Sequence, residues 1–272
     1  MYIKSIFHYN YYMFINDINP ILIAVGPITI RYYGVLLVGG MIAYLFITQW
    51  IIKREKLSLD LFYAICFYLL LGVIIGARLG YVLFYGFSYY ANNPLDVIKI
   101  WEGGLSSHGA TLGLLISYVL FYYFNKSKFK NNLAKYTDLL VVAMPLAASF
   151  VRIGNFINSE IVGRPTDLPW GVVFARLGET VARHPVQIYE FIIAVIIFII
   201  LLLFYLKIYK KTKPYCLIFL FVLLYFASRF LIEFTKEFQV TEGSLTMGQY
   251  LSIIPVIVAL IYFIFAYPRL RK

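Results

Sequence analysis

Residues 136–158 read YTDLLVVAMPLAASFVRIGNFIN, an apolar run that ends in an arginine and two asparagines. About 20 apolar residues are enough for a helix to cross a bilayer. Six other stretches of this kind occur in the 272-residue chain, which is 62% hydrophobic and has a mean hydropathy of +0.80. A soluble protein of this length is roughly half apolar. The sequence therefore predicts an all-α integral membrane protein, with residues 1–272 forming a single membrane domain.

Seven transmembrane helices are predicted, and the basic residues between them predict their orientation. Lys and Arg number 14 in one alternating set of connecting segments and 6 in the other. The basic set faces the cytoplasm under the positive-inside rule, so the N-terminus lies outside and the C-terminus is cytoplasmic. The same rule explains much of the net charge of +11 without a nucleic-acid partner. The predicted spans are residues 28–52, 59–86, 104–124, 136–158, 188–206, 214–234 and 245–267.

The first twelve residues do not resemble a signal peptide. They are rich in aromatic residues and asparagine, with one lysine and no small-residue cleavage site. We therefore interpret residues 1–12 as an atypical or non-native extension, with Met13 as an alternative start.

Four arginines remain inside the predicted spans, and the topology puts all of them in the outer half of the membrane. They are Arg31, Arg78, Arg152 and Arg229. Each costs roughly 2.5–3.5 kcal/mol at a bilayer centre, so each needs a reason. Snorkelling to the interface explains Arg31, one turn from the edge, but it does not explain why the others gather on one side. The same depth holds further polar side chains, namely Tyr33, His108, Asn155, Asn158 and Glu233.

This set of side chains predicts an anionic ligand at the level of the lipid headgroups, because arginine presents a planar fork of donors to phosphate or carboxylate. No group of His, Cys, Asp and Glu has metal-ligand spacing, so neither a metal nor a cofactor is expected. His108 follows two glycines and two serines, and either helix capping or catalysis fits that stretch equally well. Arg229 and Glu233 are four residues apart, which also fits an ion pair that only fixes helix packing.

The stretch VRIGNFINSEIVGRPTD, residues 151–167, resembles the signature of the prolipoprotein diacylglyceryl transferase family, bacterial enzymes that lipidate lipoprotein precursors. The resemblance extends from about Met13 to the C-terminus. Small departures occur at Ser159, Val151 and Ala110, where glycine is more usual, and they leave the charged positions intact. Further stretches resemble family motifs in the same order: GPITIRYYG (26–34), GARLGYVLFY (76–85), GGLSSHGATLG (103–113), HPVQIYE (184–190), SRFLIEF (228–234) and TMGQYLS (246–252).

The resemblance implies a reaction in the bacterial cytoplasmic membrane, near its outer leaflet. The diacylglyceryl group of phosphatidylglycerol moves to the lipobox cysteine of a signal-peptide-bearing prolipoprotein, a thioether forms, and glycerol phosphate leaves. This is the first step of lipoprotein maturation. The implied catalytic residues are His108, Arg229, Glu233 and Tyr33. The implied substrate-binding residues are Arg152, Asn155, Glu160 and Gly163, and we add Arg78 from its depth in the membrane.

The implied roles follow the chemistry of the leaving phosphate and the attacking thiol. Arg152 binds the lipid phosphate, and Arg229 stabilises the charge that develops during transfer. Glu233 orients Arg229. His108 is either the base that ionises the thiol or a residue that positions the substrate. Asn155 and Glu160 order the loop and the headgroup, and Gly163 permits a close backbone approach.

Three other classes of membrane protein are alternatives to a lipid-modifying transferase. An anion transporter should show two related halves and a site at the midplane, and the sequence shows neither. A retinal receptor needs a lysine inside a span, and none of the seven predicted spans contains one. A non-catalytic lipid-binding protein would keep the arginines and would differ only in having no turnover.

Overall fold

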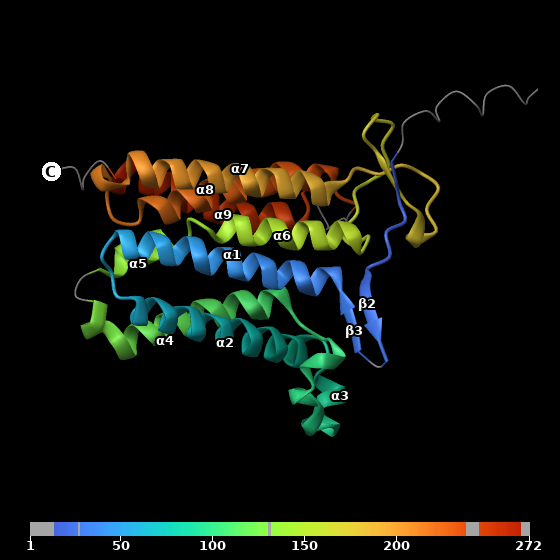
Figure 1. Ribbon diagram of the computed structural model, residues 1–272, viewed down its shortest axis with the longest axis horizontal. Coiled ribbons are helices and arrows are strands. Elements are labelled where there is room, and N and C mark those ends of the chain that lie inside the picture. Colours follow the sequence, from blue (N-terminus) through green and yellow to red (C-terminus); the bar gives the residue numbers. More distant parts are fainter. Residues whose placement is uncertain (1–13, 27, 130–131, 238–244, 268–272) are drawn as a thin grey trace, which may run out of the picture. The chain divides into compact units, whose positions relative to one another are not determined.

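The computed structural model describes residues 14–26, 28–129, 132–237 and 245–267. The interpretation of residues 1–12 as an extension falls outside them. Nine α-helices lie within this described part (Figure 1). They are α1 (Tyr32–Arg54), α2 (Leu59–Phe84), α3 (Phe87–Asn92), α4 (Ser107–Phe129), α5 (Leu133–Leu140), α6 (Met144–Ile157), α7 (Val186–Lys207), α8 (Cys216–Ile232) and α9 (Met247–Ile261).

The mostly helical membrane architecture predicted from the sequence is confirmed, although not the number of spans. Within the described residues, six helical segments are long and apolar enough to cross a membrane. The third predicted span coincides with α4, which has 23 residues but is not among the six. Its first turns carry Ser107, His108 and Thr111, and its last turn carries two lysines, so its polar ends lower its hydropathy.

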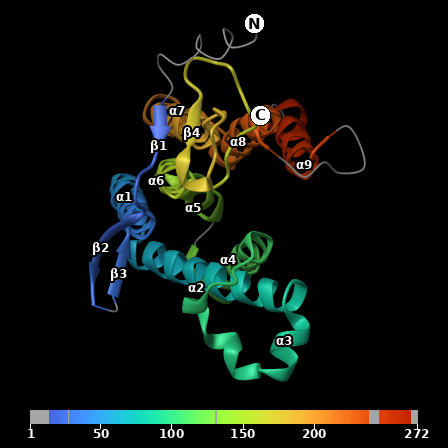
Figure 2. The same ribbon diagram turned by 90° about the vertical axis from the view of Figure 1, so that its right-hand side faces the viewer.

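The sequence analysis missed four short strands. β1 (Phe14–Asn16) pairs in parallel with β4 (Val172–Phe174), although about 150 residues separate them in the chain. β2 (Ile21–Val25) and β3 (Ile28–Arg31) form an antiparallel hairpin just before α1. Arg31 therefore ends a strand and lies outside the helix in which it was predicted. Figure 2 shows both pairs of strands.

The chain divides into two compact units, each described by itself. The first comprises residues 1–48 and 137–272, and the second comprises residues 49–136. In the first unit α6 packs on α7, α7 on α8, and α8 on α9. Pro145 lies in the first turn of α6, where its missing N–H does no harm, and it separates α6 from α5.

The second unit is built on close packing between α2 and α4. Three small residues at four-residue spacing on each helix face one another: Gly72, Gly76 and Gly80 on α2, and Gly109, Gly113 and Ser117 on α4. A methyl group added at Gly76 would overlap the carbonyl of Gly109, and one at Gly113 would overlap that of Gly72. Small residues at this spacing let two helix backbones touch, which holds helices together in a membrane.

Candidate functional site

A small cavity in the first unit lies between the end of α6, the start of α7 and the end of α8. Its volume is about 30 Å³, room for about one water molecule. Half of its lining residues are aliphatic, and the charged ones are Arg152, Glu190 and Arg229, one from each helix. The cavity therefore brings together two of the arginines predicted for the anion site and adds a carboxylate that was not predicted.

Glu190 is the centre of a chain of ion pairs beside the cavity. Its Oε2 lies 3.0 Å from Nε of Arg152, and its Oε1 lies 2.8 Å from Nζ of Lys236. Lys236 also lies 3.2 Å from Oε2 of Glu233. The side chain of Glu190 is 9% exposed and that of Lys236 is 12% exposed, so these charges are compensated mainly by one another.

Amide side chains extend the network from Arg152 to Glu160. Nη1 of Arg152 donates to Oδ1 of Asn155 at 3.4 Å, and Nδ2 of Asn155 donates to Glu160 at 2.9 Å. Asn158 donates to the other oxygen of Glu160 at 3.1 Å. Ser159 and Ile161 both have φ of 57°, an unusual conformation for residues with a side chain, and they turn the chain sharply after α6. This turn brings Glu160 back towards Asn155.

Tyr33 and Gly163 owe their positions to close approaches within the first unit. The ring of Tyr33 lies against Gly154, where an added Cβ would come within 2.7 Å of Cδ2. Gly163 donates its N–H to the carbonyl of His184 at 3.1 Å, and the next N–H binds the carbonyl of Thr235 at 3.0 Å. The close backbone approach expected at Gly163 is thus to this chain's own backbone, and it fixes the segment that carries Lys236.

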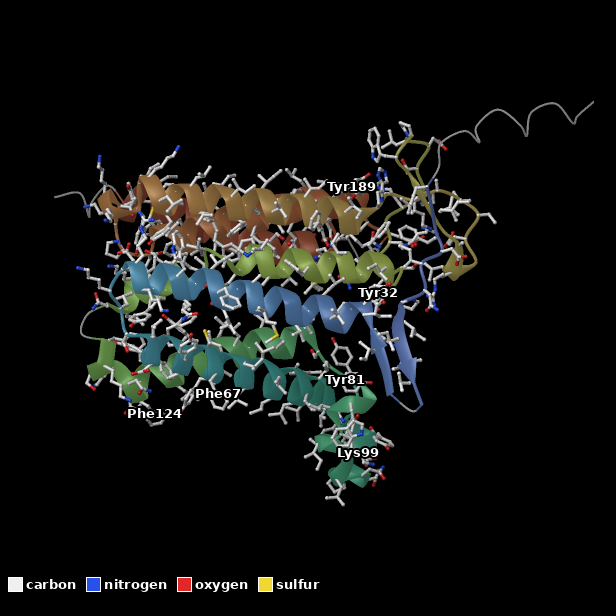
Figure 3. The ribbon with its side chains drawn as sticks, viewed as in Figure 1. Tyr32, Phe67, Tyr81, Lys99, Phe124 and Tyr189 are labelled. Atoms are coloured by element: carbon white, nitrogen blue, oxygen red, sulfur yellow. The ribbon has the colours of Figure 1, made fainter. Side chains whose placement is uncertain are left out.

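His184 and Tyr189 form a polar pair close to the hydrogen bond between Gly163 and His184. Burial, and then the charge of Arg164, lower the pKa of His184, which favours the neutral form of its ring. Trp170 donates to the hydroxyl of Tyr189 at 2.8 Å, and this hydroxyl lies 3.2 Å from Nδ1 of His184. Figure 3 shows Tyr189 at the start of α7, next to the loop that leads into this helix. These contacts secure the loop between α6 and α7.

The structure gives Arg229 and Glu233 different surroundings, although they are one helical turn apart. Glu233 is 8% exposed, pairs with Lys236 and accepts from the hydroxyl of Thr246 at 3.2 Å. The guanidinium of Arg229 lines the cavity, and it makes no hydrogen bond or ion pair with any residue in the described ranges. Neither the expected orientation of Arg229 by Glu233 nor the alternative ion pair between them is seen here.

His108 and Arg78 belong to the second unit. The hydroxyl of Ser106 accepts from the N–H of Gly109 at 3.2 Å and so caps α4, while His108 is exposed. Ser106 therefore caps the helix, and His108 does not. Arg78 is 4% exposed and lies over the ring of Tyr90. Its guanidinium donates to backbone carbonyls of the loop before α4, those of Asp96, Val97, Gly103 and Gly104, at 2.6–3.1 Å.

Sequence reasoning missed Glu190 and Lys236. Glu190 carried a signal, because it is the single acidic residue in the predicted span 188–206 and a buried carboxylate needs a partner. Lys236 follows the sixth predicted span and carried none. Among the residues that the structure describes, no group of His, Cys, Asp and Glu could hold a metal ion.

The fold and the site define the class as a multi-pass membrane protein with cationic side chains around a cavity between its helices. A family model described as prolipoprotein diacylglyceryl transferase matches residues 20–265. The chain is 38% identical over 262 residues to the phosphatidylglycerol–prolipoprotein diacylglyceryl transferase of Cupriavidus metallidurans, which covers 92% of this chain and 94% of the relative. It is 38% identical over 248 residues to the enzyme of that name from Chloroherpeton thalassium, with coverage of 90% and 91%.

A further relative of the same name, from Tolumonas auensis, is 39% identical over 238 residues, with coverage of 86% of this chain and 90% of the relative. This chain belongs to the prolipoprotein diacylglyceryl transferase family, and the resemblance seen in its sequence motifs is confirmed. It is a transferase of bacterial lipoprotein biosynthesis.

Proposed function

We propose that this protein transfers the diacylglyceryl group of phosphatidylglycerol to the lipobox cysteine thiol of prolipoproteins. The names of its relatives supply the two substrates. The observation that carries the proposal is Arg229, a cation that lines the same cavity as Arg152 and has no partner among the described residues. A guanidinium held in this way can bind an anion without first breaking an ion pair.

The reaction breaks one C–O bond and forms one S–C bond. The substrate sulfur attacks the carbon of the diacylglyceryl group that is bonded to the phosphate oxygen. That oxygen keeps the electron pair of the broken bond and leaves as part of glycerol phosphate. Arg152 binds the lipid phosphate, and Arg229 stabilises the charge that the phosphate gains. The thiol of the substrate has a pKa of about 8.5 and must lose its proton. His108, an exposed imidazole at the start of α4, is our candidate for the base.

The remaining residues of the site position these groups. Asn155 and Glu160 hold the turn after α6 and keep Arg152 in place through the contact of Arg152 with Asn155. Glu233 acts through Lys236. Tyr33, against Gly154, lines the approach to this network. The buried contacts of Arg78 support a role in holding the loop before α4, so we assign it to loop structure in place of headgroup binding.

We further propose seven spans, with α4 as the third, an outer N-terminus, a cytoplasmic C-terminus and a site near the outer leaflet. The distribution of 14 against 6 basic residues between the two sets of connecting segments supports this orientation. Single cysteines at positions 129 and 210 should resist impermeant thiol reagents in whole cells, and one at position 168 should react. Labelling of position 129 from outside would refute the orientation.

The reaction itself is tested with purified protein, phosphatidylglycerol and a lipobox peptide, by following the mass of the peptide. We expect the peptide to gain one diacylglyceryl group and glycerol phosphate to appear in equal amount. A peptide with serine in place of the lipobox cysteine is the matched control and should not react. Binding of phosphatidylglycerol without any change in peptide mass would refute transfer and favour a non-catalytic lipid-binding protein.

A further inference from the structure

Glu190 occupies an unusual position for a carboxylate in a site that must bind a phosphate. It lines the cavity, and each of its oxygens is held by a different cation, Arg152 on one side and Lys236 on the other. Oε2 pairs with Arg152 by charge and distance without a hydrogen bond, and the two cations favour the ionised carboxylate, which makes Glu190 a weak base. A carboxylate that bridges two cations instead reduces the positive charge that a bound anion meets.

The charge around the cavity follows from its ion pairs. We define the cavity cluster as the charged side chains that line the cavity, together with every charged side chain connected to them directly or through a further ion pair. It contains three cations, Arg152, Arg229 and Lys236, and two anions, Glu190 and Glu233. The net charge of the cavity cluster is therefore +1.

This charge matches the substrate better than the product. In the proposed reaction the phosphate of phosphatidylglycerol is a diester with a single negative charge. Cleavage of the C–O bond converts it to a monoester, which carries about −1.5 to −2 at pH 7. The cavity cluster neutralises the diester completely, whereas it leaves the monoester partly uncompensated. Without Glu190 the charge of the cavity cluster would be +2, which suits the monoester.

We propose that Glu190 is an internal counter-ion that keeps the phosphate product from binding too tightly. This inference rests on the proposed function, because that function supplies the charge change from diester to monoester. Glu190 is a positioning residue in this scheme. It holds Arg152 through Nε and Lys236 through Nζ, sets the charge of the site, and makes no bond to the reacting atoms.

The inference is tested by measuring the affinity of glycerol phosphate for the wild type and for Glu190→Gln in detergent. Glutamine keeps the shape of the side chain and removes its charge. One unit of charge removed beside a bound phosphate should tighten binding by roughly 10- to 100-fold at an effective dielectric constant of about 20. A mere structural defect would weaken binding, so the direction of the change separates the two explanations. Unchanged or weaker affinity in a folded variant would overturn the proposal.

Further variants complete the test. Glu179→Gln makes the same chemical change at a carboxylate that pairs with Arg183 away from the cavity, and it should leave the affinity unchanged. Lys236→Met lowers the charge of the cavity cluster and should weaken binding by at least about tenfold. If Glu190→Gln does not fold, Glu233→Gln decides, because it also raises the charge of the cavity cluster by one and should tighten binding; unchanged or weaker affinity there would overturn the proposal.

Kinetics distinguish failure of this inference from failure of the proposed function. In a transfer assay Glu190→Gln should complete a first turnover and then slow, because glycerol phosphate stays bound. A wild type that transfers normally, with no difference in affinity between it and the variant, would refute the counter-ion alone. A wild type without transfer would refute the proposed function, whatever the affinities show.

Discussion

Replacing Arg229 by alanine should strongly reduce transfer and leave the fold almost unchanged. Replacing Glu233 by glutamine should destabilise the fold and leave transfer measurable. The guanidinium of Arg229 makes no hydrogen bond or ion pair with any residue in the described part of the chain. Its removal leaves no buried charge without a partner. The free energy of unfolding should change by no more than about 1 kcal/mol, the centre of the range for point substitutions, since only the packing of a half-buried side chain is lost.

The cost of losing Glu233 follows from its two contacts. It is 8% exposed and lies 3.2 Å from both Lys236 and the hydroxyl of Thr246. Breaking a buried ion pair by removing one partner costs about 3–5 kcal/mol, but Lys236 keeps a second partner, Glu190 at 2.8 Å, so we expect about 2 kcal/mol. Glutamine can still accept a hydrogen bond from Thr246, and transfer should remain measurable.

The loss of transfer in Arg229→Ala should be about 100- to 1,000-fold, the effect of removing one group that stabilises developing negative charge. Thermal unfolding in detergent, measured together with turnover per folded molecule, tests both variants. Arg229→Lys keeps the charge without the planar fork and should fall between the wild type and the alanine variant. Equal destabilisation of Arg229→Ala and Glu233→Gln, with activity proportional to the folded fraction, would refute this assignment of roles.

Three other substitutions test separate parts of the structure. Arg152→Lys keeps the charge but loses the planar fork that contacts both Glu190 and Asn155. Transfer should therefore fall about 100-fold in a folded protein, and near-normal transfer would leave Arg152 only a packing role. His108→Gln should slow transfer, and the rate should recover towards a plateau above pH of about 8.5, because the substrate thiol then ionises without a base. A loss of rate that does not vary with pH would favour substrate positioning. Gly113→Ala forces α4 away from α2 and should lower the free energy of unfolding by about 1–3 kcal/mol, measured by thermal unfolding. Gly34→Ala is the control, because an added Cβ at Gly34 meets nothing within 4 Å and should not destabilise the protein.

The helices could be predicted from the sequence because hydropathy and length are properties of one continuous segment. Arg152 and Arg229 were also predictable, since an arginine inside an apolar run is costly and the topology gives its depth. Glu190 and Lys236 were harder. Their contact joins residues 46 positions apart, and no spacing rule within one helix connects them.

Other features depend on backbone atoms, which a sequence does not display. Arg78 is a charged residue at the expected depth, yet its partners are carbonyls of the loop before α4, and any residue supplies a carbonyl. The turn after α6 depends on positive φ at Ser159 and Ile161, neither of which is a glycine. The parallel pairing of β1 with β4 joins three-residue strands whose sequences are too short to show a pattern.

The four carbonyls around Arg78 have a consequence for the biogenesis of the protein. When α2 leaves the ribosome, the loop that carries these carbonyls has not yet been synthesised. Arg78 of α2 therefore enters the translocon without partners. Such a charge costs roughly 2.5–3.5 kcal/mol at the centre of a bilayer. The cost begins to fall when Asp96 and Val97 have been made, and the set of partners is complete at Gly104. The glycines of α4 then pack against those of α2. The two helices should therefore enter the lipid as a pair, with α2 waiting beside the translocon until α4 arrives.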